Sequence, residues 1–211
     1  MRWSRVDTRK VITRKGLILL GVAAILSSVF IFVRFGKKNG PFKKYYTSGQ
    51  LLFETNYQDG KQDGSFKRYY KGGQRLFEAS YKNDKIDGSA KKYYENGKLQ
   101  EERTYRDDKR EGPGRGYYES GQLQYEGTLK DGKPDGLYKT YYGNGKLQEE
   151  GTYRNDDLEG PYKTYYENGQ LQVEATFKNG KVEGVAKKYD ENGKLREEII
   201  FKDGEPERRV N

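Results

Sequence analysis

The sequence predicts an all-β protein, a single-layer antiparallel β-meander that forms a twisted or curled ribbon and is preceded by one transmembrane helix. Three observations predict the meander. A unit of 24 residues recurs seven times between residues 40 and 207, pairs of turn residues divide each unit, and apolar residues alternate with polar ones between the turns. A stretch without charge near the N-terminus predicts the helix.

The repeat has no insertion or deletion. Its units begin at Gly40, Gly64, Gly88, Gly112, Gly136, Gly160 and Gly184. Numbered within the unit, position 1 is always Gly, position 4 is basic, position 6 is Tyr, position 10 is Gly and position 15 is Glu. The residue types that recur at these positions are those that every unit needs in order to fold. A period of this length indicates a stacked repeat architecture.

Two turns define the strands of each unit. Positions 9 and 10 are often Asn-Gly, as at Asn96-Gly97, and positions 20 and 21 are often Asp-Gly, as at Asp131-Gly132. Both pairs are typical of two-residue type I′ turns, in which both central residues have positive φ. Position 4 would then oppose 15, position 7 would oppose 12, position 18 would oppose 23, and position 14 would oppose position 3 of the next unit. About 14 strands result, over roughly 65 Å at about 4.8 Å per strand.

This register separates two faces. Positions 3, 7, 12, 14, 18 and 23 form an apolar face, and positions 4, 6, 13, 15 and 17 form a polar face. A one-layer sheet cannot bury both, so the apolar face is either an interaction site or is covered by curling and by neighbouring side chains. The candidate partner-binding residues on it are Phe42, Tyr46, Phe66, Tyr70, Tyr94, Tyr118, Tyr138, Tyr142, Tyr162, Tyr166, Leu171 and Phe177. The last unit departs from the pattern with Asp190 and Arg196, which we expect to form a polar cap.

The positive charge is confined to the N-terminus. The net charge is +9, but residues 1–39 hold nine basic residues and one acid, Asp7. The remaining chain has 32 basic and 31 acidic residues, so a basic groove for nucleic acid is not expected. Mean hydropathy is −1.16, yet 20 Tyr and 9 Phe argue against disorder.

The uncharged stretch at residues 17–33, LILLGVAAILSSVFIFV, would span roughly 26 Å as a helix. We favour an uncleaved single-pass anchor over a cleaved signal peptide, because no small-residue cleavage pattern follows it. The predicted organisation is a basic tail at 1–15, a transmembrane helix at 16–35, a linker at 36–39, repeats at 40–207 and a tail at 208–211. The basic leading tail favours a cytoplasmic N-terminus, which places the repeats outside the cytoplasmic membrane.

The chain contains neither Cys nor His, which removes disulfides, Cys/His zinc sites and His-based catalytic triads. Lys91 and Glu102 should face each other, as should Lys163 and Glu174, but a pair that recurs in every unit is a ladder of exposed ion pairs. The acidic turn at residues 154–160 lacks the ligand spacing of a calcium loop. We therefore expect no enzyme, no cofactor and no metal, and we expect neither nucleic acid nor a small molecule as the partner.

The unit G-x-Y-K-x-Y-Y-E-N-G-x-L-x-x-E-x-x-Y-x-N-G-K-x-E-G resembles the MORN repeat variant found in YwqK-type bacterial antitoxin-like proteins. The resemblance covers residues 40–207 and implies tandem β-hairpins that bind rather than catalyse. Similar proteins include antitoxins, envelope-associated repeat proteins and, among eukaryotic MORN proteins, lipid-associated or dimerising scaffolds. The expected function is protein–protein interaction or self-association at the bacterial inner membrane. The alternatives are an antitoxin that neutralises a cognate toxin and a scaffold that binds membrane lipids.

Overall fold

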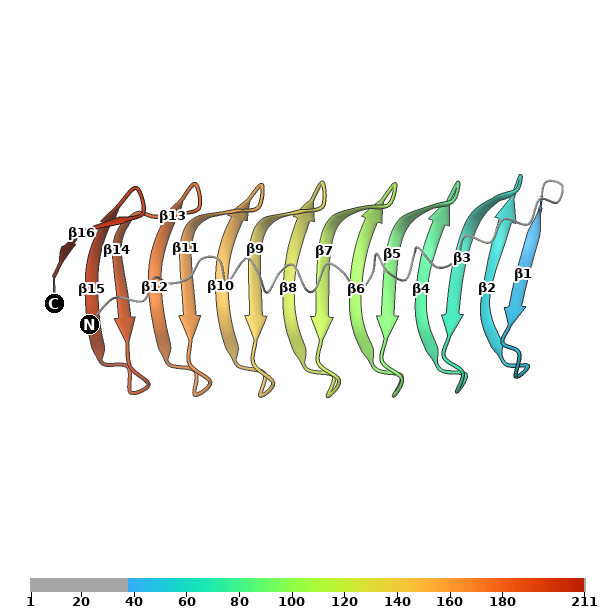
Figure 1. Ribbon diagram of the computed structural model, residues 1–211, viewed down its shortest axis with the longest axis horizontal. Coiled ribbons are helices and arrows are strands. Elements are labelled where there is room, and N and C mark those ends of the chain that lie inside the picture. Colours follow the sequence, from blue (N-terminus) through green and yellow to red (C-terminus); the bar gives the residue numbers. More distant parts are fainter. Residues whose placement is uncertain (1–37, 211) are drawn as a thin grey trace. The chain divides into compact units, whose positions relative to one another are not determined.

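The structure, a computed structural model, describes residues 38–210, and this part of the chain forms one open antiparallel sheet. Its sixteen strands lie in chain order, except that the short β13 pairs with β12 beside the main path. Figure 1 shows the strands side by side, each bowed in the same direction. The strands are β1 Gly40–Tyr45, β2 Leu51–Gln58, β3 Lys61–Tyr69, β4 Arg75–Lys82, β5 Lys85–Tyr93, β6 Leu99–Arg106, β7 Lys109–Tyr117, β8 Leu123–Lys130, β9 Lys133–Tyr141, β10 Leu147–Arg154, β11 Asp157–Tyr165, β12 Leu171–Lys178, β13 Lys181–Val182, β14 Gly184–Tyr189, β15 Leu195–Lys202 and β16 Glu205–Arg209.

The turn at positions 20 and 21 is the predicted type I′ turn in all seven units. Both of its residues have positive φ, for example 50° at Asp131 and 79° at Gly132. Asn and Asp tolerate this region better than other side chains, which explains Asn155-Asp156 with φ of 51° and 84°. These turns lie at the upper ends of the strands in Figure 1.

The prediction of a type I′ turn at positions 9 and 10 is wrong. Among the two residues only the glycine has positive φ, 83° at Gly97, and the Gly97 N–H donates to the carbonyl of Tyr94 at 2.9 Å. This pattern is a type I turn closed by a left-handed glycine. Asn96 has a different role, because its Oδ1 accepts a hydrogen bond from the Lys98 N–H at 2.9 Å, as in an Asx turn.

The longer loop changes the register beside it. Position 4 opposes position 15 as predicted, as in Lys91 opposite Glu102. One residue later the register shifts, so that Tyr93 lies opposite Leu99, and the predicted pairing of Leu99 with Tyr94 is wrong. The reason is that a three-residue loop needs an extra residue in one strand, which a β-bulge supplies.

A second irregularity surrounds the glycine at position 1. Tyr105 opposes Arg110 as predicted, but Arg103 then opposes Gly114, so position 16 rather than position 14 faces position 3 of the next unit. The two extra residues form a bulge around Gly112, whose φ is 90°. Because this bulge inserts two residues, it does not move the side chains beside it to the other face of the sheet.

The structure has two strands more than the 14 expected. β13 is separate because position 24 of that unit, Glu183, interrupts the strand and donates its N–H to the Thr176 carbonyl instead. β16 lies beyond the last full hairpin. At the predicted cap, Asp190 Oδ2 pairs with Arg196 at 2.6 Å, and Asp190 Oδ1 accepts the Lys194 N–H at 2.9 Å. That backbone hydrogen bond is the main reason why the pKa of Asp190 lies below its usual range.

Among residues 38–210 the structure contains no helix that could cross a membrane. The predicted transmembrane helix at 16–35, like the basic tail before it, lies outside the described residues. Within the sheet, the buried side chains lie on the predicted apolar face, where Phe66, Phe77 and Ile86 belong to one cluster. Burial of these apolar side chains is the main favourable contribution to the stability of the sheet.

Candidate functional site: ladders on a one-layer sheet

The polar face carries a ladder of alternating charges. In the first six units the glutamate at position 15 lies opposite the basic residue of its own unit and that of the next, as Glu54 lies opposite Lys43 and Lys67. The Lys43 and Lys67 Nζ atoms are 3.5 Å and 3.9 Å from the Glu54 carboxylate. Lys91 is in register with Glu102 as predicted, but the basic group within ion-pair distance of Glu102 is Arg115, at 3.7 Å.

The glutamates have a closer partner that the sequence did not reveal. The tyrosine at position 6 of each of the last six units donates its hydroxyl to the glutamate of the preceding unit, over 2.5–3.2 Å. Hydrogen bonds to a charged acceptor are stronger than neutral ones. The Tyr69 hydroxyl accordingly is the main reason why the pKa of Glu54 is below its usual range.

Burial and this hydrogen bond also affect the tyrosines. Burial first, and the bond to glutamate second, raise the pKa of Tyr141, Tyr165 and Tyr189 to about 12. Both effects favour the neutral hydroxyl, because the phenolate would be desolvated and would face a carboxylate. These tyrosines are therefore donors that join neighbouring units, and they are poor candidates for proton transfer near neutral pH.

The tyrosine at position 7 makes a second tie in the opposite direction along the chain. Its hydroxyl donates to the backbone carbonyl of position 6 in the next unit at 2.7–2.8 Å; the six donors are Tyr46, Tyr70, Tyr94, Tyr118, Tyr142 and Tyr166. All six are candidate partner-binding residues from the sequence, and all are half-buried. The structure gives each of them a role inside the sheet.

The other six candidates lie elsewhere. Phe66, Tyr162 and Phe177 are buried, and Phe42 and Tyr138 are half-buried. Leu171 lies opposite Tyr165 and so shares the face of that tyrosine, which corrects its predicted place beside Tyr166. The large hydrophobic residues that are exposed in residues 38–210 are Tyr45, Leu137, Val185 and Val210, none of which is a candidate. That the twelve residues bind a partner stays a prediction.

A polar cluster interrupts the apolar face in the middle of the array. Arg103 contacts Glu101 and donates to the Tyr125 hydroxyl at 2.8 Å, and that hydroxyl donates to Glu101 at 2.6 Å. The Tyr125 ring lies so close to the backbone that a Cβ on Gly116 would be 2.1 Å from it. The signal for this cluster was present in the sequence, because position 14 changes from Phe77 to a glutamate one unit later. Burial raises the pKa of Tyr125 well above its ordinary value.

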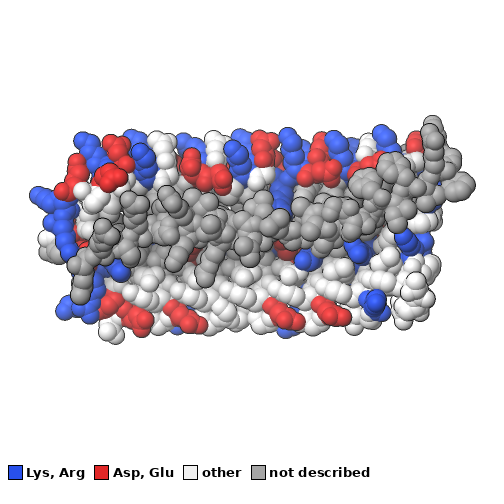
Figure 2. Space-filling view, viewed as in Figure 1, with Lys and Arg blue, Asp and Glu red and all other residues white. Residues whose placement is uncertain are grey.

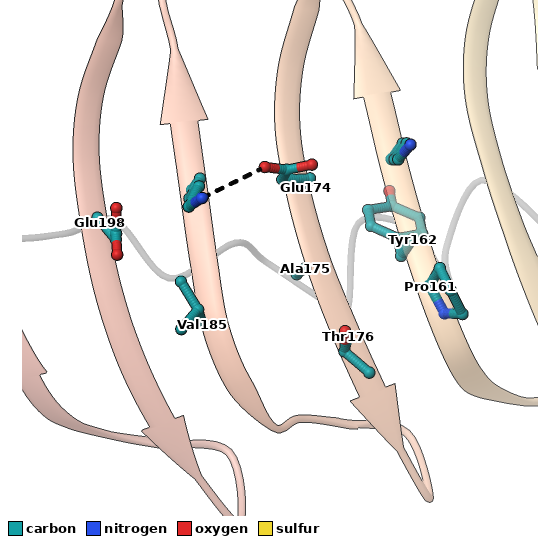
Figure 3. Close-up of a pocket in the computed structure, with 9 residues that line it drawn as sticks. Pro161, Tyr162, Glu174, Ala175, Thr176, Val185 and Glu198 are labelled. Atoms are coloured by element: carbon teal, nitrogen blue, oxygen red, sulfur yellow. Dashed lines mark ion pairs between the residues drawn. The ribbon is translucent and has the colours of Figure 1, made fainter.

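Figure 2 shows Lys, Arg, Asp and Glu side chains along the upper and lower margins of the sheet. On the polar face, β11, β12, β14 and β15 enclose a shallow depression of about 270 Å³. Its charged lining residues are Lys163, Glu174, Lys187 and Glu198, and Lys187 pairs with Glu174 at 4.0 Å (Figure 3). These are ladder groups like those of every other unit, and an active site needs unlike groups that converge. In residues 38–210 no cluster of acidic side chains could hold a metal ion.

Seven hairpins joined by recurring Tyr–Glu and Tyr–carbonyl ties define residues 38–210 as a protein built from β-hairpin repeats. The chain belongs to the MORN repeat variant family, whose model matches seven consecutive segments at residues 38–59, 62–83, 86–107, 110–131, 134–155, 158–179 and 182–203. Repeats of this type are non-catalytic and generally serve interaction with proteins or membranes. No curated protein matches the chain.

Proposed function

We propose that this chain is a non-enzymatic repeat protein that mediates protein–protein interaction or self-association while residues 16–35 hold it in a membrane. The observation that carries the proposal is the repetition itself. The tyrosine at position 6 and the glutamate at position 15 recur in successive units and join each unit to the next, while basic residues such as Lys43 pair with the glutamate of their own unit. A rigid array of this kind offers edges and faces for contact, as other stacked repeats do.

The proposed location is the inner membrane of a bacterium, with the N-terminus in the cytoplasm and the repeats outside it. The sequence supports this arrangement through the uncharged stretch at 17–33 and the basic residues on both of its sides. Fractionation of cells and protease accessibility of an added C-terminal tag test it. Protection of the tag in spheroplasts would overturn the proposed orientation, and recovery of the chain in the soluble fraction would overturn the anchor.

The interaction itself is tested by crosslinking in native membranes, followed by purification of the full chain and identification of what is attached. We expect one dominant partner, either a second copy or another protein. A chain that is monomeric and uncrosslinked under these conditions would refute the proposal. The antitoxin and lipid-binding alternatives stay predictions; killing on deletion of this gene beside an intact toxin gene, or sedimentation with anionic vesicles, would favour one or the other.

A further inference from the structure

The two ends of the array carry complementary groups. At the N-terminal end, β1 presents Lys43, Lys44 and Tyr45 on an edge that pairs with no other described strand. In every later unit, the equivalent tyrosine donates to a glutamate of the unit before it, as Tyr69 does to Glu54 at 2.7 Å. For Tyr45 the residues at 38–210 supply no such glutamate, and 55% of its surface is exposed.

The C-terminal end shows the opposite deficit. Glu198 on β15 occupies position 15, and it is the one glutamate of that column to which no residue in 38–210 donates a tyrosine hydroxyl. The depression in Figure 3 includes this residue at its margin. Beside it, Glu197 is buried and pairs with Arg209 at 2.7 Å. This end of the array therefore presents carboxylates where the other end presents lysines.

The strand that covers this edge does not follow the register of the repeat. In the repeats, position 16 opposes position 3 of the next unit, as Arg103 opposes Gly114. At the C-terminus Ile199, which is at position 16, opposes Arg209, one residue short of that register. The reason is that Arg208 stands where every unit has a glycine of positive φ, so the two-residue bulge cannot form. All five residues of β16 are exposed.

We propose that a second copy of this chain adds head to tail, with β1 of one copy replacing β16 on β15 of the other. This inference rests on the proposed function and specifies its self-association. In the register of the repeat, Lys43 would lie opposite Glu198, Lys44 opposite Glu197 and Phe42 opposite Ile199. Tyr45 would then donate to Glu198, as six other tyrosines do within the chain.

The joint between copies is weaker than the joints within one copy, for two reasons. Asp190 stands at position 7 of the last unit, so the hydroxyl tie to the following carbonyl is missing. In addition, β16 competes for the same edge and carries Pro206 among charged residues, a composition typical of protected edge strands. The association is therefore reversible and is controlled by β16, and because the contact is heterologous it produces open chains of copies.

Engineered disulfides test the joint, because the chain has no cysteine of its own. One full-length chain carries Lys43→Cys, and a second, differently tagged full-length chain carries Glu198→Cys. Residues directly opposite in antiparallel strands have Cα atoms about 4.5–5.5 Å apart, which permits a disulfide. We expect a mixed dimer on oxidation, and we expect Arg209→Glu in the second chain to increase its yield at least about threefold. Lys139→Cys, at the same position within an interior unit, is the matched control and should give none.

The absence of the 43–198 disulfide with and without Arg209→Glu would overturn the proposal, as would equal yields with the Lys139→Cys control. Co-purification of two tagged chains without cysteines provides a second measurement, in which Lys43→Glu in one chain should lower recovery and Glu198→Lys in the other should restore it. No restoration counts against the register. If crosslinking in native membranes identifies a different protein while these tests fail, the proposed function stands and this inference does not.

Discussion

Replacement of Tyr69 by Phe removes one hydroxyl and keeps the ring, so it isolates the tie between two units. The hydroxyl donates to Glu54 at 2.7 Å. A hydrogen bond to a charged group contributes about 1.5–3 kcal/mol. Lys43 and Lys67 remain near the carboxylate, whose side chain is 28% exposed, and water can replace the lost donor. We therefore expect Tyr69→Phe to lower the free energy of unfolding by about 1–1.5 kcal/mol at pH 7.

Urea unfolding of the full chain, followed by circular dichroism, measures this loss. At an m-value of about 2–3 kcal/mol/M, the midpoint should fall by about 0.5 M urea. At a concentration at which the chain is monomeric, Tyr45→Phe is the matched control, because no glutamate in residues 38–210 accepts its hydroxyl; its midpoint should stay within about 0.1–0.2 M urea of the unchanged chain.

The pH dependence has a fixed sign. The pKa of Glu54 is lower in the folded protein than its ordinary value of 4.5. The stability from this carboxylate is thus present above about pH 4.5 and is lost as the pH falls through the folded pKa. The effect of Tyr69→Phe should shrink on acidification, and the pKa of Glu54, measured by NMR, should rise in the variant. An unchanged Glu54 pKa, or equal losses for Tyr69→Phe and Tyr45→Phe, would refute the ladder argument.

Three further predictions concern other features of the sheet. Gly116→Ala places a Cβ 2.1 Å from the Tyr125 ring and should lower the free energy of unfolding by about 1–3 kcal/mol. Gly143→Ala is the control, because a Cβ there would have nothing within 4 Å and should change stability little. Equal melting temperatures of the two variants would contradict the contact. Asp156→Gly removes a non-glycine residue with φ of 84° and should raise stability by about 0.5–1 kcal/mol in urea unfolding, a result that a lower midpoint would exclude. The pKa of Tyr165 is raised to about 12 in the folded protein, against about 10 when the chain is unfolded. The contribution of its neutral hydroxyl to stability is therefore present below about pH 10 and is lost as the pH rises toward about 12. Tyrosinate absorbance and circular dichroism should change together in that window, and ionisation of Tyr165 near about pH 10 without unfolding would contradict its burial.

The repeating positions were predictable because each is dictated by local chemistry. The type I′ turns at positions 20 and 21 followed from pairs that begin with Asn or Asp. The pairing of Lys91 with Glu102 was counted from a two-residue turn that does not form, and it holds because the bulge beside Tyr93 restores the count. The turn at positions 9 and 10 was not predictable in the same way, because Asn-Gly fits both a two-residue turn and the end of a three-residue turn. Only the length of the loop, which ends at Leu99, distinguishes the two forms.

The ties between units were harder to foresee for a different reason. The hydroxyl of Tyr69 reaches Glu54 across 15 residues of sequence, on a neighbouring strand, and pattern analysis within a strand does not show such contacts. Likewise, the bulge around Gly112 depends on the positive φ of this glycine. The recurrence of glycine at position 1 does not predict how many residues the bulge inserts. Because that insertion is even, it leaves the side chains on their predicted faces, whereas the one-residue bulge at the other turn moves Leu171 to the face of Tyr165.

The paired ties have a mechanical consequence. Tyr70 reaches forward to the next unit and Tyr93 reaches back from it, so each joint between two hairpins is closed by bonds of both directions. Under a pulling force applied through the two ends of the sheet, such joints fail one after another rather than all at once. Each failure releases one unit of 24 residues, or about 80 Å of extended chain. The sheet therefore behaves as a series of small extensible links, and the last joint, between units 6 and 7, keeps both ties, from Tyr166 to the Tyr189 carbonyl and from the Tyr189 hydroxyl to Glu174.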